Sequence, residues 1–65
     1  MTELEKLKHL LEHWIEHNEA HVKTYSEWVS KAEALGEKEL ANILREVVDK
    51  SQKLDDLFKK AVGIL

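Results

Sequence analysis

The chain has 65 residues, a mass of 7.6 kDa, no cysteine and a formal net charge of −3. A core this small barely offsets the loss of conformational entropy, so such domains depend on disulfides, a bound metal or self-association. The absence of cysteine excludes the disulfides. The acidic balance opposes nucleic-acid binding, and no apolar run approaches a membrane span, so we expect neither nucleic acid nor a membrane as a partner.

The first predicted element is a long helix over residues 3–35. Thr2, with Glu5 three residues later, forms a capping-box signature that places the start of the helix. Apolar residues then recur in a heptad pattern, and Gly36 supplies the left-handed residue that ends the helix. The two principal heptad columns hold Leu4, Leu11, Asn18, Tyr25 and Ala32, and Leu7, Trp14, His21, Trp28 and Leu35.

A second amphipathic helix is predicted over residues 38–62. The short turn at Gly36 makes the two helices antiparallel, so the fold class is all-α, a single helical-hairpin domain over residues 1–65. Both helices carry apolar stripes wider than a two-helix seam requires. Such exposed area favours the pairing of two hairpins into a four-helix bundle, with the homodimer as the expected partnership. A hairpin that stays monomeric, or docks on another protein, is the alternative.

Four histidines follow one another at a constant spacing in the first helix: His9, His13, His17 and His21. Four residues advance a helix by about 6 Å and about 400°, so the row drifts from an outer position at His9 to a core position at His21. We therefore expect His17, Asn18 and His21 to form one polar cluster within the apolar seam. Burial of that cluster is unfavourable unless its polar atoms find partners.

A transition metal is one such partner. Two imidazoles four residues apart can bind one ion, and Zn²⁺, Ni²⁺, Co²⁺ and Cu²⁺ all suit imidazole ligands. His17 and His21 are the predicted ligands, with His13 as an auxiliary ligand, and a two-fold dimer would supply four nitrogens. A carboxylate or amide oxygen opposite the ligands would orient a ring by accepting its free N–H. The predicted surrounding residues are Asn18, Gln52 and Asp55.

Two other interpretations of the polar cluster stay open. A polar residue at one core position often fixes register and oligomeric state without binding anything. Asn18 and His21 would then define a structural dimerisation module. The third interpretation is haem held by two histidines across the bundle.

Catalytic motifs find little support in this sequence. The spacing of His17 and His21 matches H-E-x-x-H, but Asn18 occupies the position of the general base. No glutamate stands three residues before a histidine, as the di-iron bundle motif requires. We therefore expect a cytoplasmic protein of metal binding or homeostasis rather than an enzyme.

The stretch of residues 10–21, with Trp28 and the second helix, resembles a poorly characterised group of short helical-hairpin domains from archaea and anaerobic bacteria. The similarity would cover nearly the whole chain. Its distinctive pattern is H-x-x-x-H-N-x-x-H, at His13, His17, Asn18 and His21. The resemblance implies the hairpin fold and, by association with His-rich tracts, metal handling; it implies no activity, and His9 lies outside the pattern.

Overall fold

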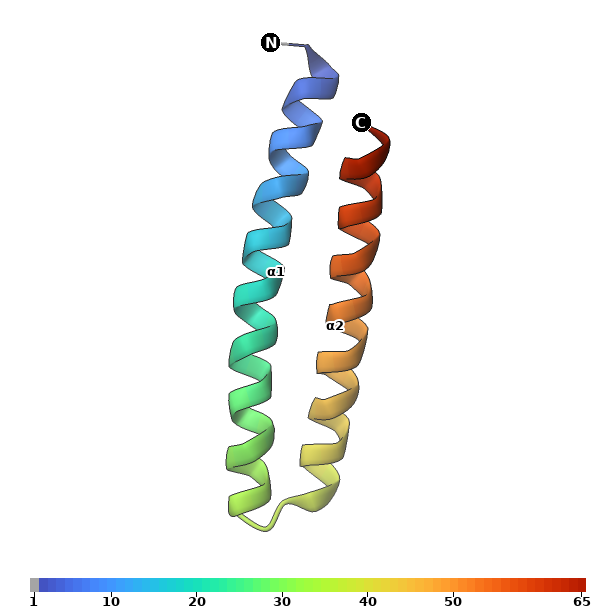
Figure 1. Cartoon of the computed structure of the whole chain (residues 1–65). Coiled ribbons are helices and arrows are strands. Elements are labelled where there is room, and N and C mark those ends of the chain that lie inside the picture. The colour runs from blue at the N-terminus through green and yellow to red at the C-terminus, as the bar shows by residue number, and fades with distance from the viewer. Residues whose placement is uncertain (1) are drawn as a thin grey trace.

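A computed structural model describes residues 2–65, which form two long helices joined by a tight turn (Figure 1). Helix α1 covers Glu3–Ala34 and helix α2 covers Lys38–Ile64. The helices lie side by side and antiparallel, in a molecule that measures 51 × 15 × 12 Å. The predicted all-α hairpin is confirmed, although α1 ends one residue earlier and α2 continues two residues further than expected. Neither helix, over the residues described, is long and apolar enough to cross a membrane.

Local signals determine where α1 begins and ends. The side chain of Thr2 accepts a hydrogen bond from the backbone N–H of Glu5 at 3.1 Å, as an N-cap does. At the other end Gly36 has a φ of 81°, and the backbone N–H of Glu37 donates to the carbonyl of Ala32 at 2.9 Å. This is the hydrogen bond of a Schellman motif, which requires the left-handed conformation that glycine adopts without strain.

The two helices meet along one heptad seam. Helix α1 contributes Leu11, Ile15, Asn18, Val22, Tyr25, Val29 and Ala32. Helix α2 contributes Ala41, Leu44, Val48, Ser51, Asp55, Phe58 and Val62. All of these residues are buried or half-buried, and their spacing alternates between three and four residues, as knobs-into-holes packing requires.

The seam uses the Leu11 column and the flanking Ile15 column of α1 rather than the Leu7 column. The tryptophans of the Leu7 column are expected to be at least half-buried and to leave apolar area exposed in a single hairpin; Trp14 is 41% exposed, Trp28 is 50% exposed and Leu35 is 75% exposed. The reason is geometric: a two-helix hairpin has only one mutual seam, and the columns of Leu11 and Ile15 occupy it. The apolar stripe of α1 is therefore divided, and no large side chain in the described chain is fully buried.

Candidate functional site

One long side of the hairpin is apolar except for a band in its middle. The residue directly before each seam residue lies on this side. One residue corresponds to a rotation of about 100° around the helix axis, and because the two helices are antiparallel, this rotation leads to the same side of the hairpin on both. On α1 these exposed residues include Leu10, Trp14, His17, His21, Thr24 and Trp28. On α2 they include Leu40, Ile43, Val47, Lys50, Leu54 and Leu57. We call this surface the apolar face.

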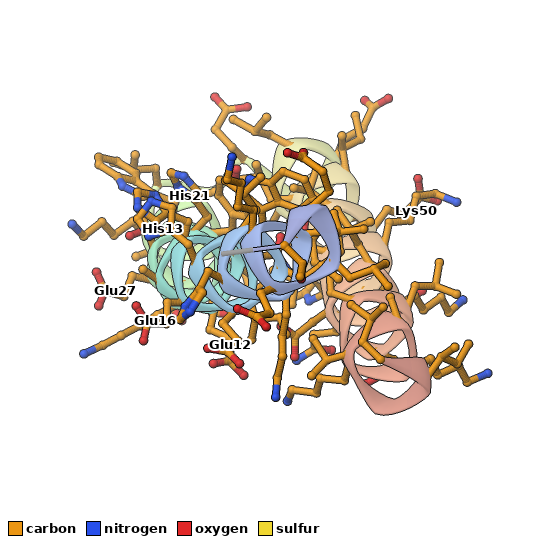
Figure 2. All side chains as sticks on the ribbon, turned by 90° about the horizontal axis from the view of Figure 1, so that it is seen from above. Glu12, His13, Glu16, His21, Glu27 and Lys50 are labelled. Carbon is orange, nitrogen blue, oxygen red and sulfur yellow. The ribbon has the colours of Figure 1, made fainter. Side chains whose placement is uncertain are left out.

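The opposite long side is polar. The residues directly after the seam residues lie there, and they include Glu12, Glu16, Glu19, Asn42, Arg45, Gln52 and Lys59. Ion pairs cross between the helices on this side, from Arg45 to Glu33 and from Lys59 to Glu19. In the end-on view of Figure 2, Glu12 and Glu16 lie on the other side of α1 from His21. The hairpin is therefore strongly two-sided, and no segment within residues 2–65 covers its apolar face.

His17 and His21 lie on the apolar face, and His9 and His13 lie further around α1, outside it. All four side chains are exposed. The ring centroids of His13 and His17 are 4.3 Å apart, and those of His17 and His21 are 6.5 Å apart. The ring of His21 stacks on Tyr25 with a centroid distance of 5.9 Å and an interplanar angle of 13°. His13 and His21 lie on the same side of α1 (Figure 2), so the structure brings three of the histidines together.

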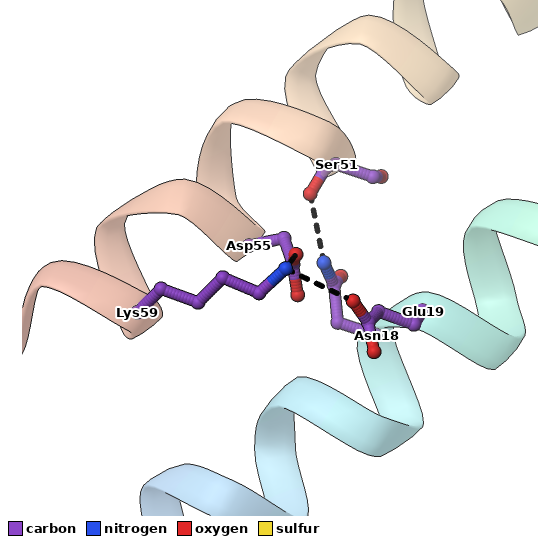
Figure 3. A network of polar contacts seen from close by, with 5 residues as sticks. All are labelled: Asn18, Glu19, Ser51, Asp55 and Lys59. Carbon is purple, nitrogen blue, oxygen red and sulfur yellow. Dashed lines mark hydrogen bonds and ion pairs between the residues drawn. The ribbon is translucent and has the colours of Figure 1, made fainter. Parts of the chain in front are cut away.

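The expected cluster of His17, Asn18 and His21 is divided between two surfaces. Asn18 is half-buried in the seam, where its Nδ2 donates a hydrogen bond to the backbone carbonyl of Ser51 at 2.7 Å (Figure 3). His17 and His21 directly precede the seam residues Asn18 and Val22, and both are exposed on the apolar face. The expectation of one buried cluster is wrong for the hairpin, because the seam takes the column of Asn18 and leaves out that of His21.

Asp55 is engaged within the hairpin rather than with a histidine. It is 7% exposed, and its Oδ2 pairs with the Lys59 Nζ at 2.9 Å (Figure 3). The same Nζ lies 3.2 Å from Glu19, and the hydrogen bonds to Asp55 and then Glu19 raise the pKa of Lys59. The Oδ1 atom of Asp55 is buried and has no hydrogen-bond partner in the described chain.

Gln52, the other residue expected beside the metal ligands, lies on the polar side. It lines an open hollow of about 450 Å³ together with Glu19 and Asp55. No hydrogen bond within residues 2–65 joins a histidine to Gln52 or Asp55. In the single hairpin Asp55 is therefore part of the seam and Gln52 lines the polar side, and neither is bonded to an imidazole.

The Lys59 network makes a prediction about alkaline stability. Because the pKa of Lys59 is raised in the folded state, its contribution to stability is complete below about pH 10.5 and is lost as the pH rises through the higher folded value. We expect the difference in melting temperature between wild type and Lys59→Gln to be constant below about pH 10.5 and to shrink as the pH rises above that value. The control is Lys53→Gln, because within the described residues Lys53 pairs with Asp49 alone, on the surface of its own helix. A Lys59→Gln difference that also stays constant above that value would contradict the role of the network.

Comparison with known proteins identifies the family. Residues 7–65 match the family described as a domain of unknown function (DUF8180). A protein of Archaeoglobus fulgidus, described as uncharacterized, is 39% identical over 62 residues, which are 95% of this chain and 98% of that protein. No solved structure matches the chain. The archaeal relative agrees with the archaeal hairpin group that the sequence resembles, and the chain belongs to the DUF8180 family.

Proposed function

We propose that the protein is a cytoplasmic homodimer that binds a divalent transition metal through His17 and His21, in metal binding or homeostasis rather than catalysis. The observation that carries this proposal is the position of the two histidines. They stand in the middle of an apolar face that nothing in the chain covers. A second copy that covers this face would bury the imidazoles and bring a second pair beside them.

The exposed area of the hairpin supports a second copy as the occupant. The chain exposes 5134 Å², whereas a compact protein of 7.6 kDa exposes about 4,300 Å². The excess of about 800 Å² equals what each partner loses in a stable protein interface of standard size. The side chains buried within the hairpin are mostly small, with Ala32 and Ala41 the most completely buried. Pairing would supply the core that the hairpin lacks.

The chemistry of imidazole supports the metal. Removing an imidazole nitrogen from water without giving it a new partner costs several kcal/mol of free energy. A divalent ion of the zinc–copper series accepts the lone pair of the neutral ring and removes that penalty. Residues 2–65 of one hairpin hold no group of three metal-ligating side chains. In the proposed dimer, the second copy supplies the further ligands of a site with three or four protein ligands. His13, 4.3 Å from His17 between ring centroids, remains the auxiliary ligand.

The polar layer of the seam favours a second candidate function. Asn18 on α1 and the consecutive seam residues Ser51 and Asp55 on α2 lie in the middle of the hairpin, and Asn18 donates a hydrogen bond to the backbone carbonyl of Ser51. Such a layer specifies register at some cost in stability. In this case the protein is a structural dimerisation module, and its histidines bind nothing.

Sedimentation equilibrium at micromolar concentration tests the dimer and separates the two functions. We expect twice the monomer mass of 7.6 kDa, because two-fold dimers are the commonest assembly and the apolar face requires cover. For the metal-binding protein, added zinc tightens the dimer and chelator weakens it. For the structural module, the association constant is the same in both solutions. A helical monomer at every concentration, with or without zinc, would contradict both functions.

A further inference from the structure

We infer that the two copies pair antiparallel, about a two-fold axis that is perpendicular to the helices and crosses them at the level of His21. The His21 side chains of the two copies then face each other and complete the metal site. This inference rests on the proposed homodimer, and it adds the orientation of the copies and the reason that one copy alone has an incomplete site.

The exposed column of α1 is symmetric about His21. It reads Leu7, Trp14, His21, Trp28 and Leu35 at intervals of seven residues. A two-fold axis at the level of His21 exchanges positions that lie equally far on either side of it. Trp14 would therefore meet Trp28 of the second copy, and Leu7 would meet Leu35. A two-fold interface requires such a self-complementary surface.

The exposed stripe of α2 is symmetric about the same level. Gln52 stands level with His21, because the turn at Gly36 and the contacts of Asn18 with Ser51 and of Trp14 with Phe58 set the register. Three of the four pairs of face positions that lie equally far from residue 52 bring an apolar residue onto an apolar residue of the second copy, and the innermost pair brings Lys50 onto Leu54. The apolar pairs are Leu40 with Ile64, Ile43 with Ala61, and Val47 with Leu57. Two stripes with independent sequences therefore share one centre.

An axis parallel to the helices would place the histidines differently. It would lay α1 of one copy on α2 of the other, so that His21 meets Lys50 and Leu54 and the two α1 helices lie diagonally across the bundle. A cationic side chain is no ligand for a metal cation. The perpendicular axis lays α1 on α1, so the imidazoles meet imidazoles. His17, about 6 Å along the helix from His21, then flanks the axis on each side as the neighbouring ligand.

Spin-label distances distinguish the two orientations, since a single introduced cysteine is unique in this chain. In Glu37→Cys the label lies in the turn. The perpendicular axis places the two turns at opposite ends of the dimer, so we expect a distance near the 51 Å length of the hairpin. The parallel axis brings the turns together, within about 20 Å, the width of two helix layers. The measurement is made on the full chain with diamagnetic zinc present.

The companion label is Lys23→Cys, on the outside of α1 close to the level of His21. Lys23 directly follows Val22 and lies toward the polar side, but it is at mid-length of the hairpin. Both orientations therefore give a distance well below the 51 Å length of the hairpin, so these labels report whether a dimer forms at all. A short distance from both labels overturns the antiparallel orientation and leaves the dimer intact. The absence of dipolar coupling from both labels, in variants that are helical by circular dichroism, overturns the proposed dimer and the inference with it.

Discussion

Trp28→Ala should abolish dimerisation and unfold most of the protein at micromolar concentration. In the hairpin the Trp28 ring is 50% exposed and its described partner is Lys31, whose Nζ lies 4.3 Å from the ring centroid. In the proposed dimer its remaining burial comes from the second copy. Truncation of a buried tryptophan costs about 3–5 kcal/mol, a large share of the 5–15 kcal/mol that stabilises a typical domain. Sedimentation equilibrium and circular dichroism measure the two effects.

Glu27→Ala is the matched control, because Glu27 is the adjacent residue and its side chain points away from the hairpin (Figure 2). We expect it to retain the mass and helicity of wild type. Trp14→Ala should resemble Trp28→Ala and also lose the contact with Phe58, whose ring centroid lies 6.0 Å away. A Trp28→Ala protein that dimerises as tightly as wild type would show that the apolar face is not the interface.

Zinc or nickel should raise the melting temperature of wild type, and His17→Ala or His21→Ala should remove that increase. A ligand that binds only the folded state at 100 times its Kd adds about 2.7 kcal/mol of stability. For a domain of this size that free energy corresponds to about 10–20 °C in melting temperature. His9→Ala is the control that keeps the full increase, because His9 lies outside the apolar face; His13→Ala should give an intermediate increase. Thermal melting with metal and with chelator measures each value.

The same melting experiment has a characteristic pH dependence. A metal ligand must be neutral imidazole, so protons compete with the ion for the ring nitrogen. The increase should be present at pH 7.5 and should be lost as the pH falls and protons displace the ion from the ring nitrogens. If wild type melts at one temperature with zinc, nickel and chelator at pH 7.5, the histidines bind no metal and the structural dimerisation module is the better explanation.

The fold was predictable because its signals are local. Thr2 caps α1 through a hydrogen bond to Glu5, three residues away, and Gly36 ends α1 through its own backbone conformation. A heptad repeat that runs between these two points permits only a helix. The contact of Trp14 with Phe58, which depends on the position of the turn, was predictable for the same reason.

The division of the apolar stripe was not predictable from the column pattern alone. The columns of Leu11 and Trp14 are similarly hydrophobic. The apolar stripe is wide enough for two seams, so the column pattern does not indicate which column packs against the second helix of the same chain. A simple signal was nevertheless present. The residues before Leu11, Ile15 and Asn18 are apolar or histidine, whereas the residues after them are all glutamate. That asymmetry identifies the seam between the two and places the histidines on its apolar side.

The Asp55–Lys59–Glu19 network was missed for a different reason. Lys59 and Asp55 are four residues apart on one helix, a spacing that is visible in the sequence. The contact of Lys59 with Glu19 crosses between the helices and depends on a register that only the packed seam defines. In the hairpin Asp55 does not contact a histidine. The register of the seam places it beside Lys59, which also contacts Glu19 on the polar side.

A native mass spectrum of the tag-free protein, exchanged into zinc at neutral pH, tests the metal-linked dimer most directly. We predict a species of two chains with one zinc ion, and loss of the zinc in His21→Ala. The removal of an affinity tag matters, because added histidines would supply ligands of their own. A dimer that carries no zinc would contradict the metal site, and a single chain that carries no zinc would contradict both the site and the dimer.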